Sequence, residues 1–74
     1  MVNLPRFVAE FRNYAQREIL KCNLLGHDLM RADENINHAF NMAYIGAATI
    51  DECMERMLHE VIWAKKTGRY EKGE

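Results

Sequence analysis

The sequence predicts an all-α fold, a small oligomeric bundle in which a helical hairpin packs against a third helix. Apolar residues recur at three- and four-residue steps along three segments, which is the periodicity of amphipathic helices. The links between the segments are short and contain glycine, as is usual between antiparallel helices. We expect one helical domain over residues 1–68, with helices at about residues 4–25, 28–45 and 50–67.

The first helix is expected to begin near Asn3. Pro5 suits the first turn of a helix, where a missing N–H costs nothing, and Asn3 can act as the cap. Gly26 is the expected end, because glycine adopts the left-handed conformation that terminates helices. The apolar face is formed by Leu4, Phe7, Val8, Phe11, Tyr14, Ala15, Cys22 and Leu25.

The second helix is expected to start after Gly26, with Asp28 or Asp33 as its cap, and to end at Gly46. Its residues at helical spacing predict one apolar face. They are Leu29, Ala32, Ile36, Ala39, Phe40 and Ala43.

The third helix has the clearest start. Thr49 and Glu52 stand at the spacing of a capping box, in which each side chain accepts a hydrogen bond from a backbone N–H of the other residue. Gly68 is the expected end, and the charged residues 69–74 are expected to form a mobile tail.

Self-association is predicted from size and from surplus apolar surface. A chain of 74 residues buries only about 60% of the surface that it exposes when unfolded, so its stability is marginal. Trp63 projects roughly 160° from the apolar stripe of its helix, and Met42 and Ile45 also lie off theirs. Tryptophan often anchors interfaces, and methionine adapts to irregular surfaces. The predicted interaction surface comprises Trp63, Met42, Ile45, Met54 and Met57.

Composition argues against several other classes. The chain has a formal net charge of −1, which gives no electrostatic attraction to nucleic acid or to acidic lipid. No apolar run approaches the roughly 20 residues that a membrane helix needs. The two cysteines, Cys22 and Cys53, follow no export signal, so we interpret them as buried thiols in a cytoplasmic protein.

Glu18 is the most anomalous residue, because it falls near the middle of an apolar stripe. A buried carboxylate needs a cation, a hydroxyl, a metal or a protonated symmetry mate. The simpler interpretation is a position at the edge of the core, where Glu18 reaches water or an arginine. The alternative is a ligand site.

Neither a metal centre nor an enzyme is predicted. Glu34 with His38, and Glu55 with His59, are pairs four residues apart, but both histidines project from polar sides of their helices. The Glu-x-x-His spacing of di-iron bundles does not occur in the sequence. We expect solvated pairs, no cofactor, and no catalytic constellation, because a three-helix chain of this size offers little volume for a cleft.

The leading hypothesis is a small protein–protein interaction module, such as a regulator, inhibitor or adaptor. It would act by helix packing, either with further copies of itself or on a larger protein. The alternative is a helical bundle that binds a small ligand or metal at a site formed around Glu18 between subunits.

Overall fold

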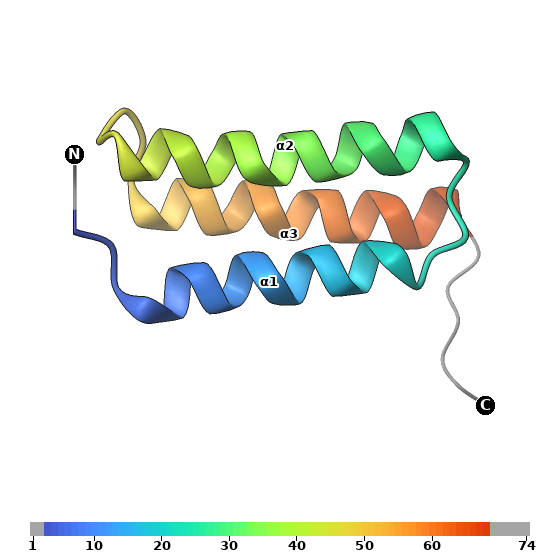
Figure 1. The fold of residues 1–74 in the computed structure, drawn as a ribbon, viewed down its shortest axis with the longest axis horizontal. Helices are drawn as coiled ribbons and strands as arrows, with labels where there is room; N and C mark the ends of the chain where they lie inside the picture. The colour runs from blue at the N-terminus through green and yellow to red at the C-terminus, as the bar shows by residue number, and fades with distance from the viewer. Residues whose placement is uncertain (1–2, 69–74) are drawn as a thin grey trace.

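The computed structural model describes residues 3–68 and confirms the all-α class. Three helices, α1 (Arg6–Leu20), α2 (Gly26–Tyr44) and α3 (Ile50–Thr67), form a bundle in which every pair of helices is in contact. Figure 1 shows that α1 and α3 run in the same direction and that α2 runs opposite to both. Short links therefore join antiparallel neighbours, as their expected length predicts.

The ends of α1 differ from the expectation. Pro5, not Asn3, occupies the cap position, and no side chain accepts a capping hydrogen bond there. The helix ends at Leu20, well before Gly26. Asn23 adopts the left-handed conformation, with φ at 49°. Asparagine tolerates this region better than most residues, so it turns the chain where glycine was expected to do so.

Gly26 instead opens α2, which corrects its predicted role. The cap position is taken by Leu25, without a side-chain cap, so neither Asp28 nor Asp33 caps the helix. Asp28 lies in the first turn, where a carboxylate stabilises the positive end of the helix dipole. Asp33 lies inside α2 and bonds to other side chains.

The end of α2 is as predicted, because Gly46 is left-handed with φ at 81°. Its N–H donates to the Ala43 carbonyl at 3.1 Å, and the Ala47 N–H donates to the Met42 carbonyl at 2.8 Å. These two bonds form a Schellman motif, which satisfies carbonyls that have no partner within the helix.

The capping box at the start of α3 is confirmed. The Glu52 N–H donates to Thr49 Oγ1 at 3.1 Å, and the Thr49 N–H donates to Glu52 Oε1 at 2.9 Å. Two hydrogen bonds from Thr49 lower the pKa of the Glu52 carboxyl. The bond from the Thr49 backbone has the larger effect, and the bond from its hydroxyl the smaller one.

Replacing Glu52 with glutamine tests this lowered pKa. The charged carboxylate stabilises the fold above its ordinary pKa of 4.5, and this contribution is lost as the pH falls through the lower pKa of the folded protein. We therefore expect the wild type to melt above the Glu52→Gln variant at neutral pH, with the difference closing in acid. Thermal unfolding followed by circular dichroism across this range measures it. Parallel melting profiles at all pH values would contradict the assignment.

The core of the bundle is built mainly from small residues. Among residues 3–68, seven of the twelve buried apolar residues are alanine or cysteine, and no leucine or aromatic residue is buried to the same degree. Small side chains let the helix backbones approach closely. The buried set is Val8, Ala15, Ile19, Cys22, Ala32, Ile36, Ala39, Ala43, Cys53, Met57, Val61 and Ala64.

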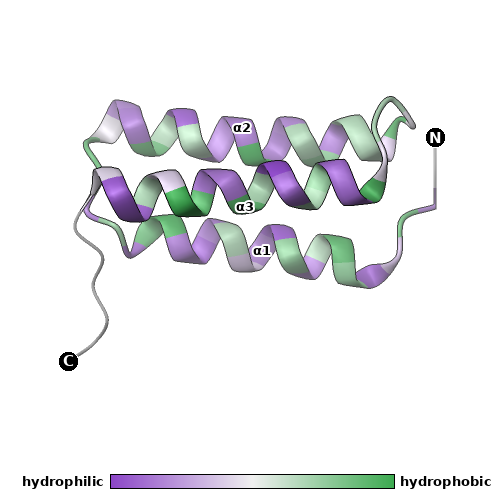
Figure 2. Ribbon diagram, turned by 180° about the vertical axis from the view of Figure 1, so that it is seen from behind, coloured by the Kyte–Doolittle hydropathy of each residue, from purple (hydrophilic) through white to green (hydrophobic). Residues whose placement is uncertain are grey.

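The three helices form a flat body that measures 39 by 24 by 14 Å between Cα extremes. The helix α3 lies behind α1 and α2 in Figure 1 and in front of them in Figure 2. Hydrophobic and hydrophilic residues alternate along all three helices (Figure 2). Within residues 3–68, no helix has both the length and the apolar character required to cross a membrane.

Candidate interaction surface

Large apolar side chains occupy much of the surface of the bundle. Ten of them, distributed over all three helices and both links, count as exposed within residues 3–68. Single exposed apolar residues are normal, but a large adjoining group on a small domain marks an interaction surface. They are Phe7, Tyr14, Leu20, Leu25, Met30, Tyr44, Ile45, Leu58, Ile62 and Trp63.

The structure leaves two of the predicted interface residues on the surface, but far apart. Trp63 is 37% exposed and lies at the seam between α2 and α3, beside Arg31. Ile45 is 59% exposed and lies just after α2, near the other end of the bundle. Met42 is half-buried beside Ile45 and lines a small hollow at the link between α2 and α3. These three side chains therefore do not form one patch.

The two methionines of α3 face inward. Met57 is fully buried in the core, and Met54 is half-buried against it. The expectation that Met57 lies on the interaction surface is therefore wrong. Its position on the helix points it toward the contact with α1 and α2, where an unbranched side chain fills the irregular space between small residues.

The most exposed apolar side chains gather at an apolar groove that was not predicted. We name it the α1–α2 groove. Its volume is about 520 Å³. Leu20 and Met30 stand on its walls with 67% and 63% of their surfaces exposed. Leu25, also 67% exposed, comes directly before the lining residue Gly26. The lining residues are Gln16, Ile19, Leu20, Gly26, Leu29, Met30 and Asp33.

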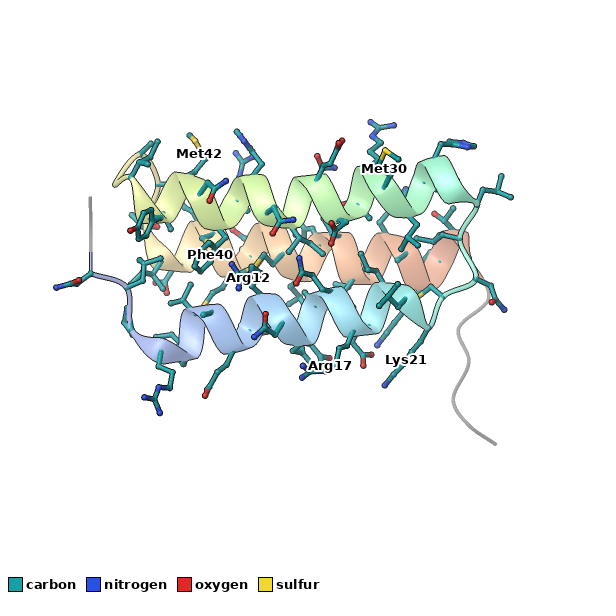
Figure 3. All side chains as sticks on the ribbon, in the orientation of Figure 1. Arg12, Arg17, Lys21, Met30, Phe40 and Met42 are labelled. Atoms are coloured by element: carbon teal, nitrogen blue, oxygen red, sulfur yellow. The ribbon has the colours of Figure 1, made fainter. Side chains whose placement is uncertain are left out.

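A polar network next to this groove fixes the relative position of α1 and α2. Gln16 Nε2 donates to Asp33 Oδ1 at 3.1 Å and to Asn37 Oδ1 at 3.2 Å. One turn further along the seam, the Arg12 guanidinium stacks over the Phe40 ring, 4.4 Å from its centre (Figure 3). Because these contacts join residues at matched heights, they set which residues of α1 and α2 lie side by side.

A second, more polar hollow of about 500 Å³ lies between α2 and α3. It brings His38 together with Glu55 and His59, which lie on the helix that faces it. However, within the part of the chain that the structure describes, no three histidine, cysteine or acidic side chains are placed to hold a metal ion. The hollow therefore gives no support for a metal centre.

Glu18 is buried, as its position within the apolar stripe of α1 predicts, and is only 7% exposed. Lysines, rather than an arginine, supply the positive charge. Its Oε2 is 3.1 Å from Lys21 Nζ, and its Oε1 is 3.6 Å from Lys65 Nζ. Both lysines are partly exposed, so the carboxylate sits between charges at the edge of the core.

Both cysteines are buried free thiols, in agreement with the interpretation from sequence. Burial raises the pKa of the Cys22 thiol and outweighs the opposite effect of the Lys65 ammonium. Burial also raises the pKa of Cys53. Since the thiolate is the reactive form, neither side chain is prepared for nucleophilic chemistry.

Comparisons of the sequence and structure with protein-family models, with curated proteins and with solved structures found no significant match. The geometry of this chain is therefore the basis for inferring its function.

Proposed function

We propose that this chain is a small protein–protein interaction module that self-associates by helix packing. It would serve as a regulator, inhibitor or adaptor. The observation that supports the proposal is the number of large apolar side chains left exposed: ten of them lie on the surface, while seven of the twelve buried apolar residues within residues 3–68 are alanine or cysteine.

This distribution matters energetically. Burying apolar surface contributes about 25 cal/mol per Å², so each buried alanine or cysteine contributes less than a larger side chain would at the same position. The larger exposed side chains contribute only when a second surface covers them. Association is one of the few ways in which so short a chain gains stability.

An intersubunit ligand site around Glu18 gains no such support. Lys21 and Lys65 already supply positive charge to its two carboxylate oxygens. A metal ion at this position would lie close to both ammonium groups. We therefore propose a structural role for Glu18.

Sedimentation velocity tests the proposal. We expect the weight-average sedimentation coefficient to rise between micromolar and near-millimolar protein and to fall again on dilution, as reversible mass action requires. A compact monomer throughout this range would contradict self-association.

A further inference from the structure

We infer that two copies of this chain pack face to face through their α1–α2 grooves, with each copy filling the groove of the other. This inference rests on the proposed self-association and names the surface that carries it. It differs from the surface expected from sequence, because neither Leu20 nor Met30 belongs to that set.

The groove combines projecting side chains with a space that can receive them. Leu20 and Met30 project from opposite walls, while Ile19 is buried and Leu29 half-buried at its base. At Gly26 a Cβ would meet no atom within 4 Å, so the groove is open there. Interdigitated packing of this kind is how helices associate.

The heights of these residues along the bundle suit a two-fold axis parallel to the helices. Gln16 and Asp33 are bonded across the seam. Leu20 lies one turn after Gln16, and Met30 one turn before Asp33, so the two side chains share a level on antiparallel helices. A parallel two-fold axis places α1 of each copy opposite α2 of the other. Leu20 of each copy then contacts Met30 of the other, so the same contact occurs twice, as an isologous interface requires.

The positions of charged residues also favour a second copy of the chain as the partner. Arg17 comes directly after Gln16, and Glu34 directly after Asp33. Because Gln16 and Asp33 are bonded to each other, Arg17 and Glu34 lie at about the same height along the bundle, and both are exposed. Arg17 lies on the outer edge of α1 (Figure 3). The proposed axis brings each arginine to the glutamate of the second copy at the rim. The net charge of −1 adds little repulsion between copies.

The face of the bundle that carries the groove has room for a dimer interface. The broad face, which Figure 1 views directly, spans 39 by 24 Å. A standard interface buries about 800 Å² on each partner. The result is a four-helix arrangement of α1 and α2 from both copies, a common architecture for antiparallel helices. Trp63, at the seam between α2 and α3, stays outside it.

The test uses the full chain and single charged substitutions on each wall. Leu20→Lys places a cation near the C-terminal end of α1, and Met30→Glu places an anion near the N-terminal end of α2; the helix dipole favours both charges. Ile62→Glu on α3, where Ile62 is 42% exposed, is the matched control. We expect each groove variant to raise the Kd of self-association at least tenfold, and the control to leave it unchanged. Thermal unfolding in dilute solution verifies that each variant is folded. Trp63 emission should not change on association.

Two outcomes would overturn the inference, and they are distinguishable. If Ile62→Glu disrupts association while the groove variants associate normally, self-association stands but uses another face. If the wild type is monomeric at all concentrations, both the groove and the proposed function fail.

A charge exchange provides an independent measurement. Arg17→Glu and Glu34→Arg should each weaken association several-fold, because each places like charges together at two symmetric positions. The double variant should restore the affinity to within about twofold of the wild type. Additive losses in the double variant would contradict the proposed axis.

Discussion

Replacing Ile36 with alanine is expected to lower the free energy of unfolding by about 2–5 kcal/mol. Ile36 is fully buried near the middle of α2 and is among the largest side chains in the core. Its buried companions on the same helix are the alanines 32, 39 and 43. Small neighbours already in close contact have little freedom to move inward, so the cavity stays open and its full cost remains.

This loss is large compared with the total free energy of unfolding of the domain. At roughly 0.05–0.15 kcal/mol per residue, a domain of this length has a stability of about 4–11 kcal/mol. Urea unfolding followed by circular dichroism, at a concentration where the chain is monomeric, measures the change. The matched control is Ile62→Ala, which makes the same chemical change at a half-exposed helical position and should cost about 1 kcal/mol or less. Equal losses at the two positions would show that Ile36 is no more buried than Ile62.

Local signals in the sequence were sufficient for the number and type of elements. The helical spacing of apolar residues predicts three helices, and the capping box places the start of α3 at Thr49. Gly46 ends α2 as expected. Each of these features depends on residues within one or two turns, so each can be inferred without knowledge of tertiary contacts.

The end of α1 could not be predicted in the same way. Both Asn23 and Gly26 are able to turn the chain, and the choice between them depends on packing. Ending the helix at Leu20 puts Cys22, which lies in the link, into the core with no exposed surface. That gain comes from contacts with distant residues, which a pattern in the sequence does not reveal.

Where the side chains expected at the interaction surface lie also depends on packing. The predicted apolar faces mixed large and small residues, and the structure buries small ones such as Ala15 while it leaves Phe7 and Leu25 exposed. Met57, expected on the interaction surface, is buried, whereas the exposed Leu20 and Met30 were not singled out. Their positions off the apolar stripes were the signal that could have identified Leu20 and Met30.

The charged residues 69–74, expected to form a mobile tail, lie outside the described part of the chain. Just before them, Gly68 follows the last turn of α3 and its N–H donates to the Ala64 carbonyl at 2.8 Å. A Cβ at Gly68 would overlap the backbone carbonyl of Cys22. The absence of a side chain therefore allows the end of α3 to approach the link between α1 and α2.

Replacing Gly68 with alanine is accordingly expected to destabilise the fold by about 1–3 kcal/mol, the usual cost of forcing an extra methyl into a packed contact. The backbone there is extended and not left-handed, so the cost is steric. Gly26→Ala is the matched control: its Cβ would meet no atom, and alanine favours the helix, so dilute protein should gain up to about 1 kcal/mol. Opposite shifts of the urea midpoint would confirm the close approach. A neutral Gly68→Ala would mean that the end of α3 does not rest on Cys22.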